Sequence, residues 1–439
     1  MDNAALKTEN KSYRTGVLLL LTLVYIFNFV DRQIIGAVSP FIQAEFDLSD
    51  RQLGWLKGLA FAVLYTTVGL PIAWLADRYS RVKIISISLA LWSGFTVLTG
   101  LAQGYTSLLL ARIGVGIGEA GGSPPSHSII SDMYPKEERS TALGFYSLGI
   151  PLGIMFAYFA AGQLVALLGW RGTLIILGVP GVVLALVILL VVKEPVRGAV
   201  EKNGGAQNDA PAPSLKKTFK TLLTIPSWWA MCLGITMVSF GGYSVANWTV
   251  DYLVRWDPSL KEPENFKSLL TWLGLINGLA FGIGTYGGAV LADKLGARSV
   301  RAYGWFPALA LLIGTPCLII AFWVNSLSLF LILMTVYLLA SGVYFGPCFA
   351  IAQTLAPIRM RAMSTALFFF VLNIIALGGG PTITGELSQY FAAEHGDVHG
   401  LRLAMTCLAL PYALSIMAFF WASRTLPRDW ALAEARNQG

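Results

Sequence analysis

Four charged residues lie inside long apolar stretches of this sequence. Asp31 and Arg32 stand in VYIFNFVDRQIIGAV, and Arg112 and Glu119 stand in ARIGVGIGEAGG. A carboxyl group removed from water changes its proton affinity strongly when an arginine approaches or leaves it. The two acids are therefore candidates for exchanging a proton, and the two arginines for holding an anionic group or a partner carboxylate. The alternative is a set of static salt bridges that join two helices.

The elements that hold these residues are long apolar runs. The 439-residue chain is 55% hydrophobic and only 13% charged, and its mean hydropathy is +0.64. About twelve runs of roughly 20 residues recur, and a helix of that length crosses the hydrocarbon core of a bilayer. We therefore expect an all-α membrane protein. Its expected spans lie near residues 16–40, 53–76, 84–103, 107–132, 141–167, 172–192, 228–254, 267–291, 300–323, 327–356, 363–391 and 402–423.

The glycines around Glu119 admit two interpretations. Gly116, Gly118 and Gly121 fit G-x-G-x-x-G, the pattern of a dinucleotide-binding turn. That interpretation needs a buried strand before the turn, whereas this pattern lies inside an apolar run with no such strand. We expect instead that Gly114 and Gly118, four residues apart, let two membrane helices pack closely.

A polar connection divides the chain into two halves. We expect a tail (1–15), a six-helix bundle (16–193), a cytoplasmic linker ending in an interfacial helix (194–227), a second six-helix bundle (228–424) and a tail (425–439). With the N-terminus in the cytoplasm, most of the 31 Lys and Arg residues fall on the cytoplasmic side, so both termini are expected there. The net charge of +7 then reflects contact with anionic lipid, and no nucleic-acid partner is expected.

The halves repeat a loop sequence. LADRYSR (75–81) follows the second span and LADKLGAR (291–298) follows the eighth, and a weaker echo links the segments after spans 4 and 10. Duplicated six-span halves are the layout of alternating-access transporters. Charges at helix ends are not costly, so we expect the loop charges to form a cytoplasmic gate. The candidate gate residues are Asp77, Arg78, Arg81, Arg139, Asp293 and Arg361.

Neutral polar and aromatic residues supply the remaining candidates. We expect them to line a central cavity that is charged on one wall and apolar-aromatic on the other, which suits a substrate with an ionic head and an apolar tail. Each could instead be a packing residue or an interhelical hydrogen bond. Glycine and proline in SPPS and GGGPTITG are expected to bend spans 4 and 11. The candidate cavity residues are Asn28, Tyr243, Asn247, Trp248, Asn277, Tyr337, Tyr344 and Asn373.

The sequence resembles the major facilitator superfamily. LADRYSR is similar to its signature loop, although Ala73 and Ser80 stand where glycine is usual. The fourth span matches a second motif of that superfamily through Leu108, Arg112, Gly116, Gly118 and Ala120. The resemblance implies two bundles with spans 1 and 4 as neighbours beside a central cavity.

Within that superfamily, the sequence most resembles the spinster family of lipid transporters. The resemblance lies in NFVDRQ, GWLKGLAFAVLYT, RIGVGIGEAGGSPPSHSIISDMYPKEERS, GIPLG and KEPVRG, all within residues 25–198. It implies proton-linked movement of lysophospholipids or sphingosine phosphates. The short tails favour a bacterial member.

We therefore predict a monomeric, multi-pass transporter of the cell membrane, which is the inner membrane if the chain is bacterial. Asp31 and Glu119 would couple transport to protons, and Arg32 and Arg112 would meet the substrate head group or a carboxylate. The alternative is a proton-coupled exporter of amphiphilic drugs or small organic anions. No catalytic residue, cofactor or metal ion is expected, because the sequence contains no such constellation.

Overall fold

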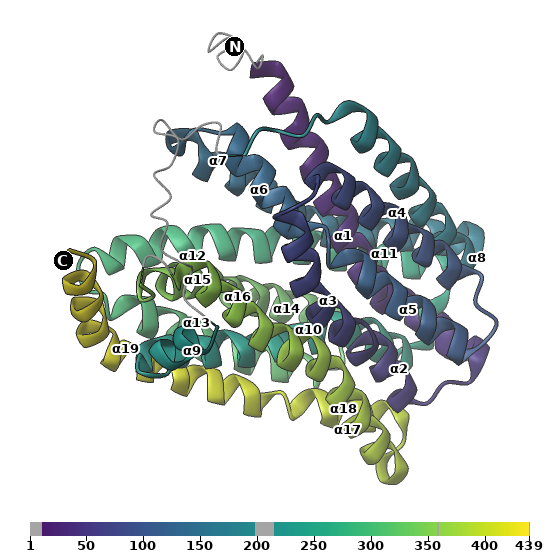
Figure 1. The fold of residues 1–439 in the computed structure, drawn as a ribbon. Coiled ribbons are helices and arrows are strands. Elements are labelled where there is room, and N and C mark those ends of the chain that lie inside the picture. Colours follow the sequence, from purple (N-terminus) through teal and green to yellow (C-terminus); the bar gives the residue numbers. More distant parts are fainter. Residues whose placement is uncertain (1–10, 198–214, 358–359, 439) are drawn as a thin grey trace. The chain divides into compact units, whose positions relative to one another are not determined.

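The computed structural model describes residues 11–197, 215–357 and 360–438. Helices dominate these three ranges, and they contain no strand (Figure 1). The expected all-α architecture is therefore present. The middle of the expected linker (198–214) and the first ten residues of the N-terminal tail lie outside the described residues.

Among the described residues, ten helical stretches are long and apolar enough to cross a membrane. One of them, Thr141–Val191, is 51 residues long and contains Gly169 at φ 66°, where two helices meet. Glycine adopts this left-handed conformation without strain. A further apolar segment, residues 105–133, is interrupted at residues 120–122 and so falls short of a single long helix. These two features account for the twelve expected spans.

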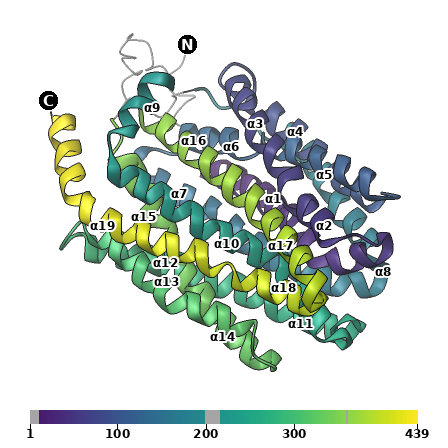
Figure 2. The ribbon, with the colours of Figure 1, turned by 90° about the horizontal axis from the view of Figure 1, so that it is seen from below.

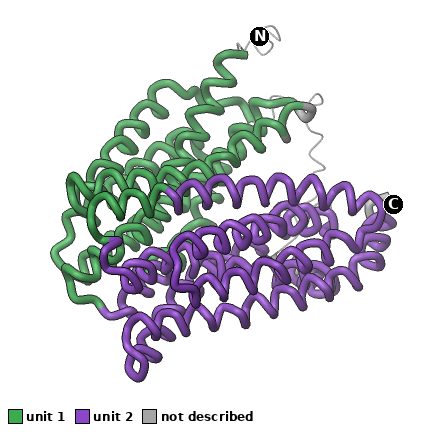
Figure 3. Tube along the Cα trace, turned by 180° about the vertical axis from the view of Figure 1, so that it is seen from behind, with its two compact units in different colours: residues 1–48, 60–210, 261–271 green, residues 49–59, 211–260, 272–439 purple. Residues whose placement is uncertain are grey.

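The chain forms two compact units (Figure 3). Most of the first half belongs to unit 1 and most of the second half to unit 2. Two short segments are assigned the other way: residues 49–59 belong to unit 2 and residues 261–271 belong to unit 1. The complete ranges are 1–48, 60–210 and 261–271 for unit 1, and 49–59, 211–260 and 272–439 for unit 2.

In unit 1 the long α8 packs against both α1 and α4, and α5 packs against α4. The packing interpretation of the glycines is confirmed. A Cβ atom on Gly114 would lie 2.4 Å from the Phe95 ring, and one on Gly118 would lie 2.6 Å from the Trp92 backbone nitrogen. The helices of unit 1 are α1 (Lys11–Phe46), α3 (Leu59–Ala76), α4 (Arg81–Gly100), α5 (Tyr105–Glu119), α6 (Ser123–Met133), α7 (Lys136–Ser147) and α8 (Gly149–Val191).

In unit 2, α10 runs beside α17 and α19 (Figure 2). A further helix, α11 (Pro263–Leu275), begins within the residues of unit 1 and ends within those of unit 2. The helices of unit 2 are α2 (Asp50–Lys57), α9 (Leu215–Leu223), α10 (Pro226–Trp256), α12 (Phe281–Gly296), α13 (Ala302–Ala321), α14 (Leu327–Gly342), α15 (Phe345–Thr354), α16 (Arg361–Leu372), α17 (Gly379–His395), α18 (Asp397–Thr406) and α19 (Ala409–Gln438).

Several helices are irregular where the sequence carries glycine, proline or asparagine. The break between α5 and α6 directly precedes the SPPS sequence. A short 3₁₀ helix, η2 (Pro258–Lys261), precedes α11, and two π-helical turns, η3 (Ile276–Ala280) and η5 (Asn373–Gly378), precede α12 and α17. The second π turn runs into GGGPTITG, where the sequence predicts a bend. Such widened turns are frequent at functional sites.

Candidate functional site

The four intramembrane charges predicted to act together lie together in unit 1. Asp31 and Arg32 are neighbours on α1, while Arg112 and Glu119 lie on α5, about two turns apart. Arg32 Nε donates to Glu119 Oε2 at 2.6 Å, and Arg112 Nη1 donates to the backbone oxygen of Asp31 at 3.1 Å. All four are largely buried. We call this set the charge cluster.

Within the charge cluster, the guanidinium of Arg32 is surrounded by aromatic rings. Its guanidinium lies 4.5 Å from the ring centre of Tyr65, 5.2 Å from that of Phe29 and 5.4 Å from that of Phe61. Aromatic faces attract a cation and so stabilise the Arg32 guanidinium at this place. Its partner Glu119 is the last residue of α5, where the backbone carbonyls repel a carboxylate. The Arg32–Glu119 pair offsets that repulsion.

The Asp31 carboxyl makes a different set of contacts. Thr96 on α4 donates a hydrogen bond to its Oδ1 at 2.9 Å. Its Oδ2 and the Oε1 of Glu119 are buried and accept no hydrogen bond from a described residue. Trp92 lies near the Asp31 carboxyl and Asn28 near the Glu119 carboxyl, but the geometry of neither contact is that of a hydrogen bond. Each buried acid therefore keeps one oxygen atom open to a proton.

Arg112 contacts the backbone of α1 instead of a carboxylate. Its two terminal nitrogens donate to the carbonyl oxygens of Asp31 and Arg32 at 3.1 and 3.4 Å, and its guanidinium lies 4.8 Å from the Phe61 ring centre. These bonds fasten α5 to α1. The geometry therefore favours a structural role for Arg112, which the sequence left open.

Among the candidate cavity residues, Trp248, Tyr337 and Tyr344 are buried within unit 2. Their hydrogen bonds join Trp248 Nε1 to Pro381 O at 2.9 Å, Tyr337 Oη to Tyr412 Oη at 2.5 Å, and Tyr344 Oη to Ser239 Oγ at 3.2 Å. These partners lie on other helices of the same unit. The packing alternative is therefore favoured for these three residues.

The asparagine candidates bond to their own helices. Asn247 Nδ2 donates to the Tyr243 carbonyl at 2.9 Å, and Asn277 Nδ2 donates to the Leu273 carbonyl at 2.8 Å. Asn277 lies in the π turn η3, and Asn373 begins the π turn η5. Two candidates thus mark the positions where spans 8 and 11 depart from regular α-helix.

Arg81 is the most heavily bonded of the candidate gate residues whose side chains the structure describes. It is 2% exposed, and its guanidinium donates to Glu194 Oε1 at 2.8 Å, to Asp132 Oδ2 at 2.5 Å and to the Pro195 carbonyl at 2.9 Å. Desolvation raises the pKa of the Glu194 carboxyl, but bonds from Val82 N–H and Arg81 outweigh it and hold the pKa below its ordinary value. Arg81 thus joins α4 and α6 to the segment after α8.

Four further gate candidates make separate local contacts. In the expected signature loop, the backbone oxygen of Asp77 accepts a bond from Arg197, and the Arg78 guanidinium stacks 3.9 Å from the Trp74 ring centre. Elsewhere, Arg139 Nε donates to the Tyr134 carbonyl at 3.4 Å, Tyr303 Oη donates to Asp293 Oδ1 at 3.1 Å, and Arg361 begins α16.

Comparison with known proteins identifies the family. Residues 21–381 match the Major Facilitator Superfamily. The chain belongs to this superfamily. It is 30% identical over 426 residues to an MFS-type efflux pump of Mycolicibacterium smegmatis, covering 95% of this chain and 94% of that one. It is 27% identical over 430 residues to the D-galactonate transporter of Escherichia coli, covering 94% and 97%.

A solved structure is also similar to this superfamily member. It is a bacterial homolog of the human lysosomal transporter Spinster, with a TM-score of 0.86 and 31% identity, over 96% of this chain and 99% of that chain. Spinster homologs are thus among its relatives, as the sequence motifs indicated. The protein is a multi-pass membrane transporter.

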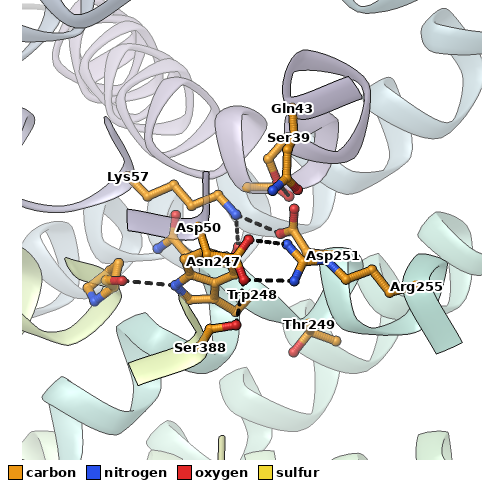
Figure 4. A network of polar contacts seen from close by, with 12 residues as sticks. Ser39, Gln43, Asp50, Lys57, Asn247, Trp248, Thr249, Asp251, Arg255 and Ser388 are labelled. Atoms are coloured by element: carbon orange, nitrogen blue, oxygen red, sulfur yellow. Dashed lines mark hydrogen bonds and ion pairs between the residues drawn. The ribbon is translucent and has the colours of Figure 1, made fainter. Parts of the chain in front are cut away.

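A second set of buried charges in the transporter was missed by the sequence argument. Lys57 Nζ donates to Asp251 Oδ2 at 2.6 Å, and both side chains are 0% exposed. Arg255 bonds both carboxylate oxygens of Asp50, at 2.5 and 2.8 Å (Figure 4). We call these four residues the α2 network. Lys57 and Asp251 stand inside expected spans, and this is the signal that could have found them, although both lie within a few residues of a span end.

Proposed function

We propose that this protein is a proton-coupled secondary transporter of an amphiphilic, lysophospholipid- or sphingolipid-like substrate that works by alternating access. Asp31 and Glu119 exchange the proton, and Arg32 moves between Glu119 and the anionic head of the substrate. The observation that carries the proposal is the geometry of the charge cluster, in which Arg32 bonds Glu119, while one carboxylate oxygen of Asp31 and one of Glu119 are buried without a hydrogen bond from a described residue.

Incomplete pairing is what a proton site requires. A buried carboxylate is stabilised as an ion by a neighbouring arginine and as a neutral acid by burial. An anion that draws Arg32 away from Glu119 removes the partner of that carboxylate and favours its protonation. Arg32 is suited to this exchange because three aromatic rings lie around its guanidinium and stabilise the cation at this position.

The nature of the cargo is supported by chemistry and by the relatives. Rings around a guanidinium favour a ligand that combines an anionic group with an apolar body. The similarity to a bacterial homolog of Spinster agrees with the spinster resemblance of the sequence motifs, and that resemblance implies the lipid cargo. Both considerations favour an anionic amphiphile over a small polar solute.

The direct test measures lysophospholipid movement in proteoliposomes. A fluorescent lysophospholipid is added with and without an imposed pH gradient, and a membrane-impermeant quencher reports the leaflet in which it resides. Asp31→Asn and Glu119→Gln are compared with the wild type. Asp47→Asn is the matched control, because Asp47 is exposed and its left-handed backbone suits asparagine equally well.

We expect the gradient to accelerate lipid movement by the wild type and by Asp47→Asn. Asp31→Asn and Glu119→Gln should lose that acceleration by at least about tenfold, or roughly 1.4 kcal/mol in activation free energy, while still binding the lipid. Lipid movement that ignores the gradient, or normal coupling in both substituted proteins, would refute the proposal.

A second candidate function is proton-coupled export of amphiphilic drugs or transport of small organic anions. The similarity to the M. smegmatis efflux pump favours the first cargo and the similarity to the D-galactonate transporter favours the second. The same charge cluster would serve either one. Gradient-driven movement of a drug or a sugar acid, with no movement of lysophospholipid, would select this candidate.

A further inference from the structure

Each half of the chain has an arginine at the start of its sixth expected span. Arg171 stands two residues after Gly169 in unit 1, and Arg402 stands two residues after Gly400 in unit 2. Each arginine contacts the end of the first span and the end of the third span of its own half. The two arginines are therefore at equivalent positions of the duplicated bundle and can be compared directly.

In unit 1 the charge of Arg171 is balanced by a carboxylate. Its Nε and Nη2 donate to Glu45 Oε1 on α1, at 3.1 and 2.7 Å. Its Nη1 donates to the carbonyl oxygens of Gly100 and Ala102, at 3.0 and 2.6 Å. The three nitrogens of this guanidinium are thus all bonded within unit 1.

In unit 2 a tyrosine takes the place of that carboxylate. Nε and Nη2 of Arg402 both donate to Tyr252 Oη on α10, at 3.3 and 3.2 Å, and this hydroxyl donates to the Phe322 carbonyl at 2.6 Å. Asp397, on the same helix as Arg402, interacts electrostatically with Arg255. No acid in the described part of the chain forms an ion pair with Arg402, so its charge is held in place but not balanced.

The charged end of Arg402 remains open. Its Nη1 bonds no group in the described ranges and is not a buried atom, although the residue as a whole is only 9% exposed. The ring centre of Trp323 lies 5.3 Å from the guanidinium, and this tryptophan is 47% exposed. Tryptophan is enriched where a membrane meets water, at the level of the lipid head groups. The free N–H groups of Arg402 therefore lie at the depth of lipid phosphates.

Apolar side chains lead away from this arginine along two helices. On α19 the exposed residues Leu410, Leu414 and Met417 follow one another at intervals of four and three, so they share one face. On α13 the exposed residues Ile313 and Ile320 are seven apart and share a face too. The two helices pack against each other (Figure 2). A cation thus stands at the end of two exposed apolar stripes.

This arrangement is complementary to a phospholipid. A guanidinium is planar and can bond two oxygens of one phosphate group, which a point charge cannot do with the same geometry. The acyl chains attached to that phosphate would cover the apolar stripes. A soluble anion such as inorganic phosphate would contact the arginine and leave the stripes unused.

We propose that Arg402, Tyr252, Trp323 and the exposed stripes of α13 and α19 form a binding site for an anionic phospholipid. Arg402 bonds the phosphate, Tyr252 holds the guanidinium in position, and the acyl chains lie along the two helices. With the cytoplasmic termini that the sequence predicts, this lipid belongs to the outer leaflet. The site is separate from the charge cluster, so the proposal goes beyond the proposed function and does not depend on the cargo.

Lipid binding to the purified protein tests the site. The protein in dodecyl maltoside micelles is titrated with dioleoyl phosphatidylglycerol, and native mass spectrometry counts the bound lipid. Dioleoyl phosphatidylcholine and inorganic phosphate are the comparison probes. Arg402→Met is compared with the wild type and with Arg171→Met, the matched control whose charge Glu45 balances. Arg32→Met reports any binding of this lipid at the charge cluster.

We expect Arg402→Met to bind phosphatidylglycerol at least about tenfold more weakly than the wild type, because charged hydrogen bonds to the phosphate are lost. Arg171→Met and Arg32→Met should bind it as the wild type does, and phosphatidylcholine should bind more weakly.

Equal affinity of Arg402→Met and the wild type for phosphatidylglycerol would overturn the proposal, as would equal binding of the two lipids. Displacement of the lipid by an equal concentration of inorganic phosphate would indicate a site for free anions and would also overturn it. A loss of binding in Arg32→Met alone would assign the lipid to the charge cluster, which overturns this proposal and leaves the proposed function standing.

A second variant tests the site with Arg402 still present. Thr406 lies four residues after Arg402, and its hydroxyl accepts a hydrogen bond from Trp323 Nε1 at 3.0 Å. Thr406→Glu supplies a carboxylate one helical turn from Arg402, as Glu45 does for Arg171. It should weaken phosphatidylglycerol binding by a similar factor of about ten. Wild-type binding by Thr406→Glu would overturn the proposal even if Arg402→Met failed to fold.

Discussion

The charge cluster of unit 1 and the α2 network of unit 2 contain the same inventory, two acids and two bases, but they are connected differently. In the α2 network each acid bonds its own base, Lys57 to Asp251 and Arg255 to Asp50. In the charge cluster one arginine pairs with Glu119, while Arg112 is bonded to backbone carbonyls. The two regions therefore contain the same numbers of acids and bases, but only in the α2 network does each acid bond a basic side chain.

This difference indicates what each region is suited to do. A network whose charges are all paired resists a change of protonation and holds helices in place. A cluster with an open oxygen on each of two buried acids can accept a proton without first breaking a bond. Buried charge marks both regions as important, and the pairing distinguishes a cluster suited to exchanging a proton from a network suited to holding helices together.

The largest expected contrast is in stability. Asp251→Asn removes the carboxylate that bonds the buried Lys57 ammonium, which should destabilise the protein by about 3–5 kcal/mol. Asp31→Asn removes an acid with no arginine side-chain partner, so its melting temperature should stay close to that of the wild type while coupled transport is lost. Thermal unfolding of the purified proteins measures both. An equally large loss of stability in Asp31→Asn would indicate that the charge cluster is as static as the α2 network.

A smaller contrast is expected within the charge cluster. Arg112→Met removes charged hydrogen bonds to two carbonyls of α1 and should cost about 1.5–3 kcal/mol of stability. Arg32→Met should cost less, because Glu119 is able to take up a proton once its partner is gone. Unfolding measured beside gradient-driven transport checks the pair. A lower stability of Arg32→Met than of Arg112→Met would contradict the assigned roles.

The docking of α2 is open to a steric test of smaller size. Gly58→Ala places a methyl group against Thr382 and should destabilise the docked α2 by about 1–3 kcal/mol. Gly69→Ala, in the following helix, is the control, because nothing lies within 4 Å of its added Cβ. Hydrogen exchange of residues 50–57 should accelerate in the first variant alone. Equal exchange in the two variants would argue against close docking.

The smallest effect concerns Glu194, outside the spans. Since its pKa is lowered in the folded protein, its contribution to stability is present above its ordinary value of 4.5 and is lost as pH falls through the lowered value. Glu194→Gln should therefore have a lower melting temperature than the wild type near neutral pH, with the gap closing below about pH 4.5. A gap that persists at lower pH would assign the contribution of Glu194 to packing and not to charge.

Sequence reasoning reached the architecture and one of the two charged regions. Hydropathy placed the spans, and the glycines around Glu119 indicated close helix packing. The α2 network was missed because Lys57 and Asp251 stand toward the ends of their apolar runs, where charge is usually hydrated. Their burial follows from the packing of α2 against α10 and α17, helices roughly 200 and 330 residues away in the chain.

The sequence by itself determined that the chain is a helical membrane protein in two related halves with acids and arginines inside its spans, because the cost of placing polar groups in hydrocarbon acts on each segment locally. Only the tertiary structure decided which of those charges pair. Arg112 bonds backbone where Arg32 bonds Glu119, and α2 docks in the unit opposite to that of α1 and α3. Pairing depends on the rotation of each helix and on which distant helix it meets, and neither is encoded in local spacing.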